Sequence, residues 1–189
     1  MAKKTAKKAI KKAAKKAAKK GTQKAAKKAA KKASPKPAPA PLQRSNSINP
    51  YLTFNGNCEE AFNFYKSVFG GKFPYIGRFK DMPAPEGKPI PASEREKIMH
   101  VSLPIGNGSI LMGSDSSESF GHASVVGNNF SISLNAYSEK EADRIYKGLS
   151  QDGKSTMPMT KTFWGSYFGM LTDKFNIQWM VSVEEKKNK

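Results

Sequence analysis

A strand-then-helix pattern occurs twice in this chain of 189 residues and constrains its fold more than any other feature. The first copy spans residues 52–66 and the second spans 132–147. Asn55 matches Asn135 at an offset of 80 residues. Later positions match at an offset of 81, which pairs Ala61, Tyr65 and Lys66 with Ala142, Tyr146 and Lys147. Self-similarity of this kind indicates two structural modules of the same type, and one inserted residue accounts for the change of offset.

Both helices carry recognisable start and stop signals. Asn57 is the expected N-cap of the first helix, and Ser138 to Glu141 predicts a capping box at the second. Glycines at 70–71 and at 153 are the expected exits. Helical spacing of apolar residues predicts buried faces made of Ala61, Phe64, Tyr65, Val68 and Phe69 in the first helix and Ala142, Ile145, Tyr146 and Leu149 in the second.

Three strand-like segments follow each helix. They are 73–79, 98–104 and 109–113 in the first copy, and 156–162, 166–172 and 177–183 in the second. A polar, proline-rich loop separates the first two segments at 81–96, and Gly106-Asn-Gly108 predicts a hairpin turn. The predicted order is β-α-β-β-β, twice. The fold class is therefore α+β, in one domain over 46–189.

Three parts of this domain resemble a known family. They are Pro50–Gly71, then Met99–Leu103 with Leu111–Asp115, and Phe163–Gly165 leading to Asp173–Trp179. The chain resembles the vicinal oxygen chelate superfamily (the glyoxalase/bleomycin-resistance/dioxygenase fold), and within it the PhnB-like branch. The resemblance implies two βαβββ modules that form a cleft, often within a homodimer. Asn176 replaces the usual Gly of an Asp-Lys-Phe-Gly turn, and Asn tolerates positive φ next best.

Metal-dependent members of that superfamily hold a divalent cation with four strand residues. Carried over to this chain, the four positions fall on Asn49 or Pro50, on Met112 or Gly113, on Ser131 and on Met180. None of these is a good ligand for Zn, Ni, Mn or Fe. We therefore expect no metal and no other cofactor in the cleft.

Aromatic and methionine side chains are the better candidates for the cleft, because such a lining suits a planar or apolar small molecule. His100 either points into the cleft or is hydrogen-bonded at its edge, whereas His122 is expected to be exposed. The one cysteine, Cys58, excludes an intrachain disulfide, fits a reducing compartment, and is expected to pack in the core. The candidate cleft residues are Phe54, His100, Met112, Phe163, Trp164, Phe168 and Trp179, with Tyr167 beside them.

The first 45 residues form a separate, strongly basic region. They contain sixteen Lys and Arg44, no acidic residue, and a repeated Lys-Lys-Ala-Ala unit. Of the 33 basic residues, only sixteen remain in 46–189, against 15 acidic ones, so the net charge of +18 belongs almost entirely to this tail. Like charges repel and nothing is available to bury, so we expect a disordered tail followed by a proline-rich linker.

Nucleic acid is the expected partner of the tail, because each Lys–phosphate contact releases a counterion. No aromatic side chain is present to stack on bases, so binding should be independent of sequence. An anionic membrane, polyphosphate, an acidic protein and a purely solubilising role remain alternatives. In composition the tail resembles those of linker histones and bacterial histone-like proteins. The paired lysines are Lys3, Lys4, Lys7, Lys8, Lys11, Lys12, Lys15, Lys16, Lys19, Lys20, Lys27, Lys28, Lys31 and Lys32.

Three functions fit these observations. The first is a metal-free module that binds a small ligand or dimerises, tethered to nucleic acid by the tail. The second is an enzyme of the superfamily (a lyase, isomerase or dioxygenase) with an unusual active site. The third is a structural protein of the nucleoid that bridges DNA through two tails. The sequence contains no secretion signal and no apolar stretch long enough to span a membrane, so we expect a cytoplasmic, nucleoid-associated protein.

Overall fold

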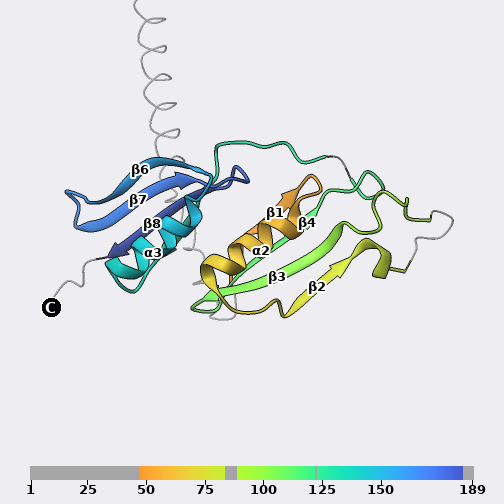
Figure 1. The fold of residues 1–189 in the computed structure, drawn as a ribbon, viewed down its shortest axis with the longest axis horizontal. Helices are drawn as coiled ribbons and strands as arrows, with labels where there is room; N and C mark the ends of the chain where they lie inside the picture. The colour runs from red at the N-terminus through yellow and green to blue at the C-terminus, as the bar shows by residue number, and fades with distance from the viewer. Residues whose placement is uncertain (1–46, 84–88, 122, 185–189) are drawn as a thin grey trace, which may run out of the picture. The chain divides into compact units, whose positions relative to one another are not determined.

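The computed structural model describes residues 47–83, 89–121 and 123–184. The first module contains β1 (Tyr51–Phe54), α2 (Cys58–Phe69), β2 (Tyr75–Arg78), the 3-10 helix η1 (Phe79–Asp81), β3 (Ile98–Gly106) and β4 (Ser109–Asp115). The second contains β5 (Ile132–Asn135), α3 (Glu139–Leu149), β6 (Lys154–Lys161), β7 (Ser166–Thr172) and β8 (Gln178–Glu184). The predicted order of elements and the α+β class are confirmed (Figure 1).

Each module forms one four-stranded sheet with the same strand order. The first is β1-β4-β3-β2 and the second is β5-β8-β7-β6. In both, the first strand runs parallel to the last, and the other neighbours are antiparallel. The predicted hairpin turn lies between β3 and β4, with Asn107 at a φ of 51°. Asn176 adopts a φ of 64°, as expected for the residue that replaces Gly in its turn.

A buried aspartate, rather than the predicted Asn57, caps the start of α2. The side chain of Asn57 makes no capping hydrogen bond. Instead Asp115 Oδ1, at the end of β4, accepts from the amides of Gly56 and Cys58 at 3.0 and 2.9 Å. A carboxylate favours this position because it satisfies free N–H groups and complements the helix dipole. The same side chain also accepts from the amide of Ile98 at 2.8 Å, which ties β3 to the helix start.

The buried face of α2 is rotated from the predicted one. Phe62 is fully buried, whereas Phe64 and Phe69 are half-buried. The reason is Gly113 on β4, because a Cβ there would lie 2.6 Å from the Phe62 ring. Gly113, which has no side chain, therefore leaves the space that Phe62 fills. The spacing of apolar residues along a helix carries no information about the strand that packs against the helix, so it could not predict this burial.

The second helix follows its prediction more closely. Ala142, Ile145 and Leu149 are buried, while Tyr146 is half-buried and donates from its hydroxyl to the carbonyl of Met157 at 2.9 Å. Ser138 Oγ accepts from the Glu141 amide, as predicted. The Glu141 carboxylate does not complete a capping box, because it pairs with Arg144 at 2.8 Å instead.

The two modules share a core through one buried aspartate, Asp173. Its Oδ2 accepts from the Tyr65 hydroxyl of α2 and from the Trp179 indole of β8, each at 2.9 Å. Its Oδ1 accepts from the amides of Phe175 and Ile177. Trp179 also packs against the Tyr65 and Phe69 rings of the first module. The second sheet is thus held against the first helix by a fully hydrogen-bonded carboxylate.

Candidate functional site

Each sheet has one face packed on a helix and one face that is open. Side chains alternate along a strand, so the buried residues identify the helix side and their neighbours identify the other. In the first module, Leu52, Val101 and Leu111 lie on the helix side. The residues between them form what we term the first open face, which consists of Tyr51, Thr53, Tyr75, His100, Ser102, Met112 and Ser114.

Three rings from three strands gather on the first open face. His100 of β3 lies between Tyr51 of β1, at 5.6 Å between ring centroids, and Tyr75 of β2, at 5.8 Å. The Tyr51 hydroxyl and His100 Nδ1 are 3.2 Å apart and share a hydrogen bond. Gly77 pairs with His100 across the sheet, and a Cβ there would lie 2.4 Å from the Tyr75 hydroxyl. The small residue on β2 therefore leaves space for the Tyr75 ring beside the imidazole.

The corresponding second open face is rich in methionine. It consists of Ser133, Met157, Phe168, Met170, Thr172, Gln178 and Met180. Met170 pairs with Met180 on one side and with Met157 on the other, so three thioethers form a row across the sheet. Trp164, in the turn after β6, meets Phe168 edge to face and is 55% exposed. The row and its adjoining aromatic side chains form an adaptable apolar surface.

The structure separates the predicted cleft residues into two groups. His100, Met112 and Phe168 lie on the open faces, and the exposed Phe163 and Trp164 lie in the adjacent β6–β7 turn. Trp179 is fully buried on the helix side, Phe54 is buried against Phe62 and Phe175, and Tyr167 points to Asp143 of α3. Sequence reasoning missed Tyr51, Tyr75 and Met170. Strand alternation counted outward from the buried Leu52 and Leu171 would have identified Tyr51 and Met170.

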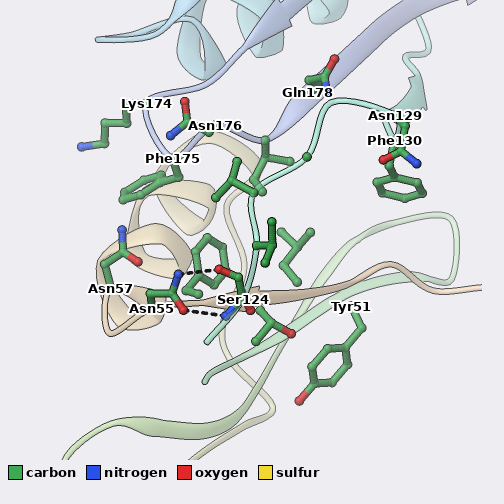
Figure 2. A pocket seen from close by; sticks show the side chains of 17 residues that line it. Tyr51, Asn55, Asn57, Ser124, Asn129, Phe130, Lys174, Phe175, Asn176 and Gln178 are labelled. Carbon is green, nitrogen blue, oxygen red and sulfur yellow. Dashed lines mark hydrogen bonds between the residues drawn. The ribbon is translucent and has the colours of Figure 1, made fainter. Parts of the chain in front are cut away.

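A pocket of about 640 Å³ lies beside the free edge of β1 and shares Tyr51 and Thr53 with the first open face and Gln178 with the second (Figure 2). It is bounded by β1, by the connection at 124–130 and by the turn at 174–178. Asn55 fixes the connection, because its side chain donates to the Ser124 carbonyl and accepts from the Ser124 amide, both at 2.9 Å. Lys174 is already engaged, at 3.6 Å from Glu60 and over the Phe64 and Phe175 rings.

The residues at the four inherited metal positions do not form a metal-binding set. Asn49 Oδ1 accepts from the amide of Ile110 at 3.0 Å, so this oxygen is already hydrogen-bonded to the backbone of β4. Gly113 has no side chain, and Met112 and Met180 offer only thioethers. Within 47–83, 89–121 and 123–184, no three His, Cys, Asp or Glu residues lie close enough together to hold a metal ion.

Cys58 is fully buried at the start of α2. Burial raises the pKa of its thiol far above the ordinary value, and the nearby charges of Asp115 and Glu59 add to this shift. A protonated, inaccessible thiol is a weak nucleophile, so the geometry agrees with a packing role.

Some predicted positions lie outside the described residues. They are His122 and all the tail lysines. In the part of the chain that the structure describes, no helix is long and apolar enough to cross a membrane.

Comparison with known proteins identifies the family of the domain. Residues 46–182 match the family described as 3-demethylubiquinone-9 3-methyltransferase. The protein YjdN of Escherichia coli (strain K12) is 33% identical over 149 residues, a match that covers 74% of this chain and 97% of YjdN.

Solved structures agree with this placement. Protein PA1353 from Pseudomonas aeruginosa is 40% identical with a TM-score of 0.63, covering 74% of this chain and 98% of the other. A putative 3-demethylubiquinone-9 3-methyltransferase, PhnB protein, from Bacillus cereus is 29% identical with a TM-score of 0.57, covering 73% and 99%. The fosfomycin resistance protein FosX from Listeria monocytogenes, 10% identical, shares the fold alone, with a TM-score of 0.53 over 77% and 98%. The chain therefore belongs to the PhnB-like family described as 3-demethylubiquinone-9 3-methyltransferase, and it has the glyoxalase/bleomycin-resistance fold.

Proposed function

We propose that the domain binds a small planar or apolar molecule without a metal ion, and that the open faces of its two sheets form the site. The observation that carries this proposal is the exposure of large side chains where a sheet would otherwise be polar. Tyr51 and Tyr75 are 48% and 49% exposed on the first open face, and Trp164 stands beside the second. Aromatic and thioether groups with a few polar atoms among them are the usual lining of a ligand site.

A second copy of the chain completes the site in this proposal. A single sheet face can bury only one side of a ligand, whereas binding sites cover most of the ligand surface. An open face with apolar side chains in a row also favours association. The homodimer brings two such faces together around the ligand, and the domain then provides both dimerisation and binding.

The basic tail tethers this dimer to nucleic acid. Its seventeen positive charges and absent acidic residues support contacts with phosphates rather than with bases. Two tails on one dimer raise the effective concentration of each other. Such a protein resides where nucleic acid is abundant, which we take to be the nucleoid in the cytoplasm.

Native mass spectrometry of the full chain, treated with nuclease, tests the domain. We expect a dimer that retains or accepts a small organic molecule. One stoichiometric Ni, Zn, Mn or Fe ion per domain would overturn the proposal of a metal-free site. A monomer at micromolar concentration would overturn the proposal that two copies of the chain share the site.

Deletion of residues 1–45 tests the tether. We expect retention on DNA to be lost at roughly 150 mM salt, while the circular dichroism of the remaining domain is unchanged. Equal DNA affinity of the truncated and full chains would contradict the proposal. The third candidate, a DNA-bridging protein with an empty cleft, predicts the same loss without any bound small molecule.

An enzymatic function is the second candidate, and one observation favours it. The hydrogen bond between Tyr51 and His100 orients an imidazole on an exposed surface, which is the arrangement of a general base. The family description names a methyltransferase, and a base of this kind would suit the removal of a proton from a phenol. In such a transfer His100 would take the hydroxyl proton and the phenolate oxygen would take the methyl group from a separate methyl donor. Turnover of a phenolic substrate in the presence of a sulfonium methyl donor, lost in His100→Phe, would establish catalysis over binding alone.

A further inference from the structure

We propose that the cluster of Tyr51, His100 and Tyr75 selects ligands that carry a hydroxyl group on a planar aromatic body. This inference rests on the proposed function and specifies its ligand class. It assigns the hydroxyl contact to the second ring nitrogen of His100, and the contact with the planar body to the flanking tyrosines.

The imidazole of His100 is held in one orientation. His100 Nδ1 shares its hydrogen bond with the Tyr51 hydroxyl, and the two flanking rings restrict rotation of the imidazole. Nε2 has no hydrogen-bond partner among the described residues. Because one nitrogen is held, the other presents a fixed direction to an incoming group.

The chemistry of Nε2 indicates the group that it binds. A tyrosine hydroxyl donates to Nδ1 or accepts from it, so Nε2 carries a proton in one case and a lone pair in the other. A carbonyl oxygen fits only the first state and an ammonium group only the second. A hydroxyl fits both, because it donates and accepts. A hydroxylated ligand is therefore bound in either tautomer.

The surroundings of the imidazole indicate the rest of the ligand. Met112 pairs with Tyr51 across β1 and β4, and places a thioether beside the ring. On the other side Gly77 keeps the space that the Tyr75 ring occupies. Tyr51 and Tyr75 each remain about half exposed, so their outer ring faces are available for stacking. An aromatic body fits these surfaces better than a flexible chain does.

Two probes of equal shape test the inference on the full chain. 2-Naphthol carries the hydroxyl, and 2-methylnaphthalene replaces it with a methyl group. We expect 2-naphthol to bind roughly fivefold more tightly, which is the usual net value of one hydrogen bond. Equal affinities would overturn the selection of a hydroxyl and leave the proposed function standing. Failure of both probes to bind would count against the proposed function itself.

Variants assign the preference to the cluster. In His100→Phe, which keeps a planar ring, we expect both probes to bind equally. In Tyr51→Phe, the imidazole loses its orienting partner, and the preference should fall by about half. Tyr137→Phe is the matched control, because it removes an exposed hydroxyl that bonds to Asn107 elsewhere. An unchanged preference in His100→Phe would overturn the assignment.

Nitrogen-15 NMR of the wild-type imidazole gives a test that does not depend on variants folding. We expect 2-naphthol to shift the Nε2 resonance of His100, and 2-methylnaphthalene to leave it unchanged. In Tyr51→Phe the Nδ1 resonance should move, because that nitrogen loses its hydrogen-bond partner. This change would distinguish a positioning role of Tyr51 from simple packing. A shift at Nδ1 in place of Nε2 would overturn the proposed contact.

Discussion

The two modules share strand order and register, yet they fill the equivalent core space from different elements. In the first, Phe62 of α2 fills the space above Gly113 of β4. In the second, the matching helix position is the exposed Asp143, and Trp179 of β8 occupies the strand position. Trp179 then reaches the helix of the other module. The large core side chain thus comes from the helix in one module and from a strand in the other. The strand side chain, Trp179, contacts the first module and so connects the two halves.

The open faces differ even more than the cores. By sheet register, His100 of the first module corresponds to Met170 of the second, and Ser114 corresponds to Met180. At these two positions the first face carries hydrogen-bonding groups and the second carries thioethers. The helix side is restricted by packing, whereas the open side is free to change, so the two modules diverge most on the side that the core does not determine.

The largest effect is expected at the junction between the modules. Asp173→Ala leaves the Tyr65 hydroxyl and the Trp179 indole without acceptors in the core, so it should lower the free energy of unfolding by about 4 kcal/mol. Asp143→Ala, which removes an exposed partner of Tyr167, is the control and should cost well under half of that. Urea denaturation measures both. Equal costs would show that the modules are not joined through Asp173.

The packing of Phe62 against Gly113 predicts a second, smaller effect on the free energy of unfolding. Gly113→Ala places a Cβ 2.6 Å from the Phe62 ring and 2.8 Å from the Leu52 carbonyl, so we expect a loss of about 2 kcal/mol. Gly121→Ala is the control, because its Cβ would meet no atom within 4 Å. Adding Phe62→Leu to Gly113→Ala should restore part of the stability. If Gly113→Ala is neutral, packing of Phe62 is not what requires the glycine.

The sequence predicted the repeating part of this fold because local patterns determine it. The strands, the helices and the β-α-β-β-β order were found from residue type and spacing, and the left-handed Asn176 from the resemblance to the Asp-Lys-Phe-Gly turn of the family. The cap of α2 and the buried position of Phe62 were not, because Asp115 and Gly113 come from a strand more than forty residues later. Tertiary contacts of this range leave no local pattern.

The same limit explains the candidate site. His100, Met112 and Phe168 were predicted as cleft residues from residue type and strand position. They lie on the open faces, and their part in a ligand site stays a prediction. Trp179, predicted among the same residues, is fully buried on the helix side. A large aromatic at a strand position fits either face, and here its indole donates to the buried Asp173. The ring cluster was missed because it needs the register of β1, β2 and β3 together.

Connections between strands give a third difference and a pH-dependent prediction. The β2–β3 connection of the first module is long and contains the buried Glu94, whereas β6 and β7 are joined by a short turn. The Ser117 hydroxyl holds the pKa of Glu94 below its usual value against the opposing effect of burial, with help from the Ser119 hydroxyl, the Glu118 amide and the charge of Lys97.

A lowered pKa in the folded state means that this carboxylate stabilises the protein above the unfolded value, near pH 4.3. That contribution is lost as the pH falls through the lower folded value. Glu94→Gln should therefore cost about 1 kcal/mol at pH 7 and less in acid. Urea midpoints at both pH values measure the difference. If the variant and the wild type lose stability in parallel on acidification, the carboxylate does not stabilise this connection.

Swapping the side chains at one pair of corresponding positions on the two open faces should have the smallest effect on stability. It also tests the proposed ligand preference most directly. His100→Met and Met170→His each alter a half-exposed side chain that no core residue requires, so each should change the free energy of unfolding by about 0.5 kcal/mol or less. The preference for 2-naphthol should disappear in His100→Met. It should not return when Met170→His is added, because Met170 lies between methionines rather than tyrosines. A double variant that regains the preference would show that a histidine alone is sufficient, and that the flanking rings do not form part of the site.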